Sequence, residues 1–165
     1  MKFTLNITDW QALAPGLSEA QQWQAWSRQP WAIDPAAPLA KLSELPMMTA
    51  RRLSSGSKLA VECGLAMLRR HQPDAVLYTS RHGELERNYR IVHALATEQA
   101  LSPTDFALSV HNSSVGNLTI AAKQPIVSSS LSAGRDTILH LCRYSARGFY
   151  RAVYLRFHGT AEKGD

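Results

Sequence analysis

Five polar side chains in three short segments have the chemistry for binding or proton transfer: His82, His111, Asn112, Arg135 and Asp136. Histidine titrates nearest to neutral pH, so His111 could act as a catalytic base or form interface hydrogen bonds, whereas His82 is expected to fix a turn. No second ligand or nucleophile adjoins His111, which favours a structural histidine with satisfied hydrogen bonds. At Arg135 and Asp136 two interpretations stay open: a helix cap beside a solvated arginine, or an ion pair directed at a ligand site or an interface.

Nucleophilic and metal chemistry have little support in the sequence. The serine run 128–130 lies outside any GxSxG elbow. His82 and Glu84 form an HxE pair without further ligands, so no metal site is expected. Cys63 and Cys142 lie among aliphatic residues, which raise a thiol pKa, and they lack CxxC spacing. We therefore expect buried, reduced thiols, no catalytic residues and no cofactor.

The elements that must position these residues follow from the periodicity of apolar side chains. Alternation with a period of two predicts strands at 3–10 and 150–157. A continuous apolar run predicts a strand covered on both faces at 75–79, and another strand is expected at 127–131. Helices are predicted at 18–29, 54–71, 84–99, 115–122 and 134–146, with a short helical segment from 102 and a loop at 30–46. The helix at 54–71 is apolar around most of its circumference, apart from a polar stripe of Lys58, Glu62 and Arg69, and should be buried.

Strands that alternate with helices predict an α/β fold with a mixed, mostly parallel sheet. The 165 residues, 45% of them hydrophobic, suffice for one domain over residues 1–165, with a frayed tail at 159–165. All four tryptophans lie within the first 31 residues, and core packing is their expected role. The N-terminus lacks a signal-peptide core, and no run of about 18 apolar residues occurs, so a cytoplasmic protein without a membrane partner is expected.

The charge pattern limits the partners. With 18 basic and 13 acidic residues the formal charge is +5. The basic residues are scattered and form no block, so we expect no nucleic-acid partner. A basic surface suits an acidic protein partner through electrostatic steering.

Three longer segments resemble the N-terminal domain of β-ketoacyl synthases, which have the thiolase-like fold. RRLSSGSKLAVECGLAMLRR at 51–70 is similar to the part in which a basic pair precedes a long buried helix. AVLYTSRHGELERN at 75–88 is similar to the next strand and its turn. SPTDFALSVHNSSVGNLTIAAKQP at 102–125 resembles the dimer-interface segment that leads to the active-site strand. The resemblance covers about residues 45 to 158 and implies half of a thiolase-like fold, with a buried central helix and covering helices.

The chain departs from a working synthase at the nucleophile elbow. Where such enzymes carry a reactive cysteine, residues 133–137 read Ala-Gly-Arg-Asp-Thr. The two histidines of a working synthase belong to the second half of the fold, and this chain ends before that half would begin. The resemblance is closest to small proteins described as chain-length factors of aryl polyene clusters. It therefore implies a catalytically silent subunit that pairs with a full-length ketoacyl synthase.

The resemblance also suggests roles for the polar residues named above. It makes His82, His111, Asn112, Arg135 and Asp136 substrate or interface residues. An acyl carrier protein is a further expected partner, and self-pairing is an alternative to a heterodimer.

A free-standing enzyme acting on an acyl or thioester substrate is the alternative function. Its site would lie around Ser80, His82, His111 and Arg135, and a deep pocket joining these side chains would support it. An exposed apolar face would instead support the subunit hypothesis, because a lone half of a fold leaves apolar surface for a partner.

Overall fold

The computed structural model describes residue 4, residues 6–132 and residues 152–157. In chain order the elements are α1 Ala20–Arg28, α2 Met47–Ala50, α3 Ser55–Arg70, β1 Ala75–Ser80, α4 Leu85–Ala96, α5 Pro103–Ala107, α6 Ser113–Ala122, β2 Val127–Leu131 and β3 Ala152–Phe157. The predicted helix at 134–146 lies outside the described residues, and so do Arg135, Asp136, Cys142 and the tail at 159–165.

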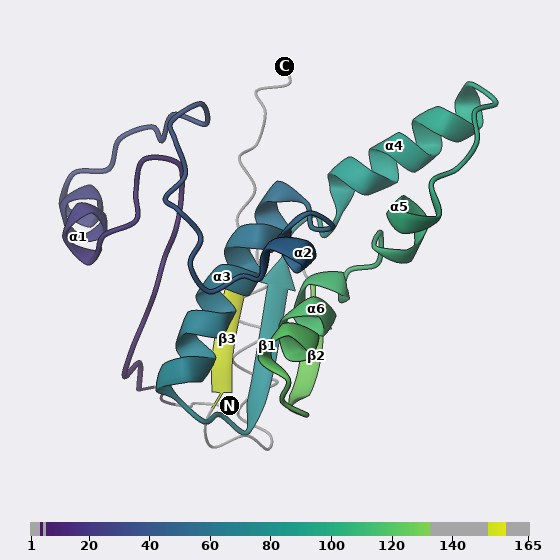
Figure 1. Ribbon diagram of the computed structural model, residues 1–165. Helices are drawn as coiled ribbons and strands as arrows, with labels where there is room; N and C mark the ends of the chain where they lie inside the picture. Colours follow the sequence, from purple (N-terminus) through teal and green to yellow (C-terminus); the bar gives the residue numbers. More distant parts are fainter. Residues whose placement is uncertain (1–3, 5, 133–151, 158–165) are drawn as a thin grey trace.

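The described strands form a parallel sheet in the order β2–β1–β3 (Figure 1). Ala75 at the start of β1 is in register with Val127 of β2 on one side and with Ala152 of β3 on the other. All six residues of β1 are buried, as its continuous apolar run predicts. Helices α4, α5 and α6 lie between the parallel strands β1 and β2, which confirms the predicted α/β class.

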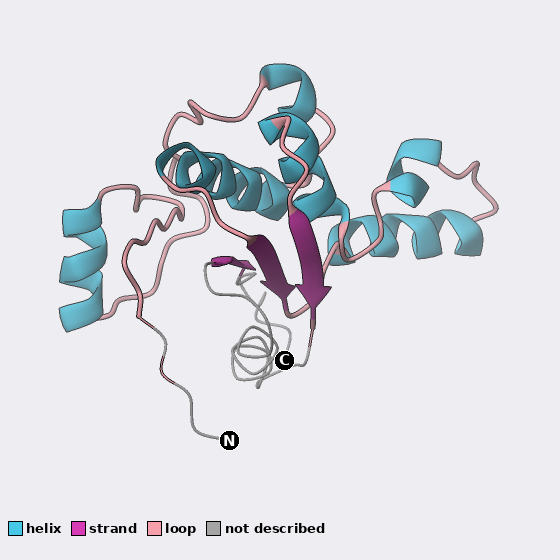
Figure 2. Ribbon diagram, turned by 90° about the horizontal axis from the view of Figure 1, so that it is seen from below, coloured by secondary structure: helices cyan, strands magenta, loops and turns pink. Residues whose placement is uncertain are grey.

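Helix α3 is the central helix, and it packs with α6 on one face of the sheet (Figures 1 and 2). It starts after Ser54, whose side-chain oxygen accepts a hydrogen bond from the backbone N–H of Ser57. It ends at Arg70, three residues before Pro73, which cannot donate a backbone hydrogen bond to continue the helix. The predicted buried central helix is therefore present.

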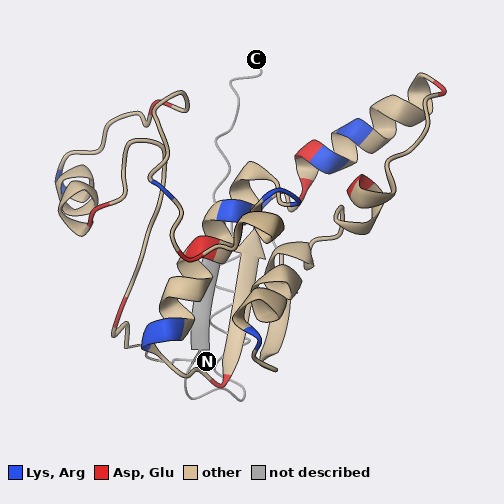
Figure 3. Cartoon of the chain, viewed as in Figure 1, with Lys and Arg blue, Asp and Glu red and all other residues tan. Residues whose placement is uncertain are grey.

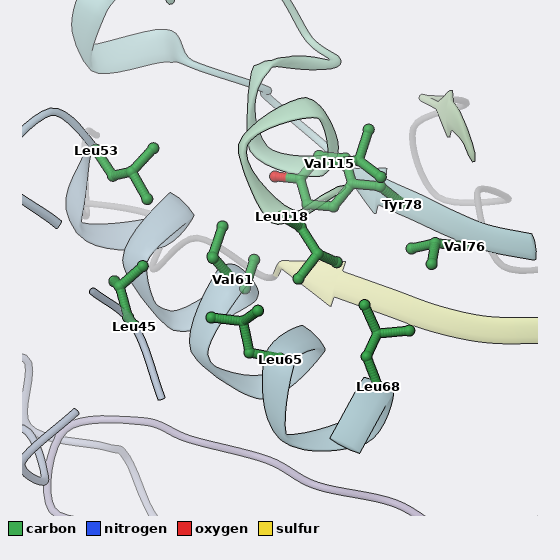
Figure 4. Packing of buried hydrophobic residues seen from close by; sticks show 10 residues of the cluster. Leu45, Leu53, Val61, Leu65, Leu68, Val76, Tyr78, Val115 and Leu118 are labelled. Carbon is green, nitrogen blue, oxygen red and sulfur yellow. The ribbon is translucent and has the colours of Figure 1, made fainter. Parts of the chain in front are cut away.

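The core lies where α3, α6 and β1 meet (Figure 4). Burial of an apolar side chain of this size stabilises the fold by about 1.5–3 kcal/mol. The large core side chains are Leu45, Leu53, Val61, Leu65, Leu68, Val76, Tyr78, Val115 and Leu118. None of these side chains comes from residues 1–41 or from α4.

The prediction of a strand at residues 3–10 is wrong for the part that the structure describes. Residues 6–10 have no regular secondary structure, and Ile7 is 83% exposed. A strand needs a neighbour to satisfy its backbone groups, and none of the described strands pairs with this segment. Asp9 instead holds the segment to the end of α3, with Oδ2 2.9 Å from Arg70 Nε and 2.7 Å from His71 Nε2. The hydrogen bond from His71, followed by that from Arg70, lowers the pKa of Asp9 to about 2.

The expected core role of the tryptophans is also wrong. Helix α1 has no buried residue. Trp23 and Trp26 pack edge to face with ring centroids 5.8 Å apart, and both are half-buried. Trp10 and Trp31 are exposed. The aromatic rings therefore pack within the N-terminal segment rather than in the core.

Helices α4 and α5, with the loop between them, form an arm (residues 85–107) that extends away from the sheet (Figures 1 and 2). The two helices pack against each other. Within the arm, Arg87 is the sole buried residue of α4, and α5 has none. A predicted helix is therefore present here without an apolar contribution to the core.

Candidate functional site

The structure places three of the five predicted site residues near the carboxyl end of β1. His82 lies in the turn after β1, whereas His111 and Asn112 precede α6. His82 and Asn112 are exposed, and His111 is half-buried. Asn112 takes the N-cap position of α6, but its side chain makes no capping hydrogen bond.

His111 packs against the turn that follows β1. Its Nε2 lies 3.2 Å from the carbonyl oxygen of Ser80, to which the ring N–H donates. Its ring centroid is 5.7 Å from that of Tyr78. Gly83 makes this approach possible, because an added Cβ would lie 3.0 Å from His111 Cδ2 and its φ is +57°. The contacts give His111 a structural role in joining this turn to α6.

A buried polar cluster lies beside this turn, where α3, α4 and α6 converge. The hydroxyl of Ser57 donates to Glu84 Oε1, and Ser57 Oγ lies 2.6 Å from Ser114 Oγ. All three side chains are buried. Burial raises the pKa of Tyr78, and the negative charge of Glu84 adds to this effect. A carboxylate next to two hydroxyls resembles a base beside a nucleophile, but this one is closed to solvent and joins three helices.

Arg87 extends the cluster into the arm. Its guanidinium donates to the carbonyl oxygen of Arg52, and Nη1 lies 2.5 Å from Asp105 Oδ1. Its Nε lies 3.4 Å from Glu84 Oε2. The side chain is only 7% exposed, so its charge is compensated by these partners rather than by bulk water.

Arg90 reinforces the same junction from the surface. It bonds Asp105 through Nη2 at 2.9 Å and Nε at 3.1 Å, and its Nη1 lies 2.7 Å from Glu86 Oε1. The hydrogen bonds from Arg90, with the charge of Arg87, hold the pKa of Asp105 below its usual value. The same bonds raise the pKa of Arg90. Figure 3 shows these charges gathered at the base of α4, while the outer half of the helix carries none.

Two cavities border the arm. One, of about 430 Å³, opens between the start of α3 and the base of α4, and the other, of about 350 Å³, lies within the arm between α4 and α5. Neither is lined by Ser80, His82 or His111. The predicted pocket joining these side chains is therefore neither of these two cavities.

The larger cavity is a basic cleft. Its acidic residues, Glu86 and Asp105, already bind Arg87 and Arg90. Three further cations line it and have no acidic partner among the described residues: Arg51, Arg52 and Lys58. Within the described part of the chain, basic residues that line the cleft therefore outnumber acidic ones.

Apolar side chains are exposed along the outer face of the arm. Leu85, Tyr89 and Val92 of α4 are 58%, 67% and 63% exposed, and Phe106 of α5 is 68% exposed. Spacings of three and four residues place Leu85, Tyr89 and Val92 on one helix face, which we call the outer stripe. Contiguous apolar surface of this kind is typical of a protein contact.

Glu62 of α3 fixes a loop rather than facing solvent. Its carboxylate accepts backbone N–H groups from Ser43 at 2.7 Å, Glu44 at 3.0 Å and Leu45 at 2.8 Å. The side chain is buried, so the polar stripe expected on α3 is interrupted here. The loop before α2 is thereby held against the central helix.

The described residues include one cysteine, Cys63, and no cluster of metal-binding side chains. They contain no group of three or more His, Cys, Asp and Glu side chains placed to hold a metal ion. Cys63 is half-buried rather than fully buried as expected. Desolvation, with the charge of Glu62, raises the pKa of its thiol to about 11, which disfavours the nucleophilic thiolate. No helix in the described part of the chain is both long and apolar enough to cross a membrane.

Sequence reasoning missed the groups that join the arm to the core: Ser57, Glu84, Arg87 and Asp105. The signal available was the acid–base spacing of Glu84 and Arg87, which is also common on solvated helix surfaces. Arg135 and Asp136 lie outside the described residues, so their roles stay predictions.

Comparison with known proteins identifies the family. The sequence model of the β-ketoacyl synthase N-terminal domain matches residues 23–143. The chain belongs to this family. A solved complex, the ketosynthase ApeO with its chain length factor ApeC from Xenorhabdus doucetiae, contains a chain that is 60% identical, with a TM-score of 0.88. The match covers 96% of this chain and 68% of that chain. None of the curated proteins matches.

These matches confirm the β-ketoacyl synthase resemblance and the thiolase-like fold expected from the sequence. They place the buried helix α3, the turn with His82 and the arm inside the family domain, because all three lie within residues 23–143. The similarity to a complex that contains a chain length factor agrees with the more specific resemblance.

Proposed function

We propose that this chain is a catalytically silent β-ketoacyl synthase-like subunit of the chain-length-factor type. It pairs with an active ketosynthase in polyene, polyketide or fatty-acid-like biosynthesis and limits the length of the acyl chain. The observation that carries the proposal is the 60% identity, over 96% of this chain, to a chain of the complex between a ketosynthase and its chain length factor.

The chemistry of condensation supports a subunit rather than an independent catalyst. A condensing enzyme holds the growing acyl chain on a cysteine thiolate, which requires a thiol of lowered pKa. Residues 133–137 contain no cysteine. Cys63 has a raised thiol pKa. In the proposed pair the ketosynthase therefore supplies the nucleophile.

The exposed surfaces agree with two kinds of contact. The outer stripe provides apolar area for a protein partner. The basic cleft, with Arg51, Arg52 and Lys58, suits an acidic partner, and we assign it to an acyl carrier protein. The proposal keeps the cytoplasmic location expected from the sequence.

Co-expression with the ketosynthase of the same gene neighbourhood tests the proposal. The pair is expected to elute as a heterodimer, with its mass measured by light scattering after size exclusion. A ketosynthase from an unrelated fatty-acid system is the control and should elute separately. A chain that stays monomeric or homodimeric beside its own ketosynthase would contradict the proposal. Acylation of the isolated chain by an activated thioester would then support the enzyme alternative.

A further inference from the structure

The arm is attached to the rest of the fold by charge rather than by an apolar core. No side chain of residues 85–107 belongs to the hydrophobic core cluster. Arg87 is the buried residue of α4, and it reaches Arg52, Glu84 and Asp105. An arginine suits this position, because its planar guanidinium presents several donors in fixed directions.

By helical geometry the outer stripe lies on the face of α4 away from Arg87, and Tyr89 at its edge also lines the cavity between α4 and α5. At about 100° per residue, Leu85, Tyr89 and Val92 fall within about 60° of each other around the helix axis. By the same geometry, Arg87 lies about 160–220° around the helix axis from each of these three residues, which is roughly the opposite side of the helix. The orientation of Arg87 therefore decides which way the stripe faces.

We propose that Arg87, held by Asp105 and Glu84, is a positioning residue that sets the arm so that its outer stripe contacts the ketosynthase partner. The inference rests on the proposed function, which supplies the identity of the partner. Charge pairing gives the arm a defined position without tying it to the core. Loosening the pair therefore changes partner binding before it changes the stability of the core.

Asp105→Asn is the decisive variant. Replacing Arg87 itself would leave Glu84 buried without its cation and risks unfolding the chain. Asp105 is partly exposed, at 19% for its side chain, and belongs to the arm. Asparagine keeps the shape but removes the charge that binds both Arg87 and Arg90. Asp34→Asn is the matched control, since Asp34 lies exposed in the N-terminal loop.

Two measurements are made on the full-length chain. The dissociation constant for its ketosynthase is expected to rise about tenfold in Asp105→Asn and to be restored by Asp105→Glu. Amide hydrogen exchange is expected to accelerate in residues 85–107 and to stay unchanged in β1 and α3. Val92→Asp, which alters the stripe alone, should weaken binding without faster exchange. Asp34→Asn should match the wild type in both.

Faster exchange in the arm with wild-type affinity in Asp105→Asn would overturn the link between arm position and binding. Unchanged exchange would overturn the anchoring role. If the wild-type chain binds no ketosynthase, the proposed function and the partner named here both fail. The exchange data would in that case still decide whether Asp105 anchors the arm.

Discussion

Glu62→Gln should destabilise the protein strongly, although the two side chains have nearly the same size and shape. The Glu62 carboxylate is buried and binds the backbone N–H groups of Ser43, Glu44 and Leu45. Glutamine has the same shape, but its NH₂ group is a donor. At least one backbone N–H then faces another donor, and the remaining hydrogen bonds lose their charge assistance.

The size of the effect follows from these contacts. A hydrogen bond to a charged group contributes about 1.5–3 kcal/mol, and an unsatisfied buried donor costs about 1–3 kcal/mol. Because the terms overlap, we expect the free energy of unfolding to fall by about 2–4 kcal/mol. For a chain of this size that corresponds to a decrease of roughly 5–15 °C in Tm.

Urea unfolding followed by two probes measures this change. Tryptophan fluorescence reports on the N-terminal segment, since all four tryptophans lie within the first 31 residues. Far-ultraviolet circular dichroism reports mainly on the helices that follow the N-terminal segment. Glu98→Gln, at an exposed position, is the control. A Glu62→Gln variant within about 0.5 kcal/mol of the wild type by both probes would refute the reasoning, because changes of that size are typical of surface substitutions.

Three other experiments test the glycine at the turn after β1, the ion pair of Asp9 and the thiol of Cys63. Gly83→Ala should cost about 1–2 kcal/mol in urea unfolding, because its φ is +57° and a Cβ would lie 3.0 Å from His111. Gly116 is helical, and an added Cβ there has no neighbour within 4 Å, so Gly116→Ala should instead stabilise the fold by up to about 1 kcal/mol. Equal effects of the two glycine substitutions would contradict the backbone strain assigned to Gly83. Asp9→Asn should lower stability above about pH 5. Folding lowers the pKa of Asp9 to about 2, so the stability difference between the variant and the wild type should vanish as the pH falls from about 4 through that value. A stability difference that does not depend on pH would exclude the ion pair as its cause. Cys63, with a pKa of about 11, should alkylate slowly at pH 8 and rapidly in urea, as followed by mass spectrometry of its peptide. Fast labelling of the folded chain would contradict the raised pKa of this thiol.

Local periodicity was sufficient to predict the central helix α3 and the central strand β1. The apolar circumference of α3 and the continuous run of β1 describe buried surfaces, and both elements occur where predicted. Residues 3–10 have an equally clear alternation. Alternation specifies one apolar face but not the neighbouring strand that must pair with it, and the structure shows no such pairing for residues 6–10.

The candidate site was less predictable, because its contacts join distant segments. Glu62 binds residues 17 to 19 positions earlier in the chain, and periodicity alone places it on a polar stripe. Arg87 and Asp105 are 18 residues apart. A buried arginine on a helix that otherwise exposes its apolar residues reverses the usual pattern. The family resemblance identified the segments 75–88 and 102–125, but it did not show that Arg87 and Asp105 pair with each other.

The attachment of the arm through Arg87 has an evolutionary consequence. Since α4 adds no apolar side chain to the core, substitutions at Leu85, Tyr89 or Val92 carry little cost in folding free energy. Selection on mutations at these positions therefore acts mainly through their effect on partner binding. Duplicated copies of this gene can therefore diverge in partner choice while the rest of the fold stays nearly the same, provided that the charged residues at the base of the arm are retained.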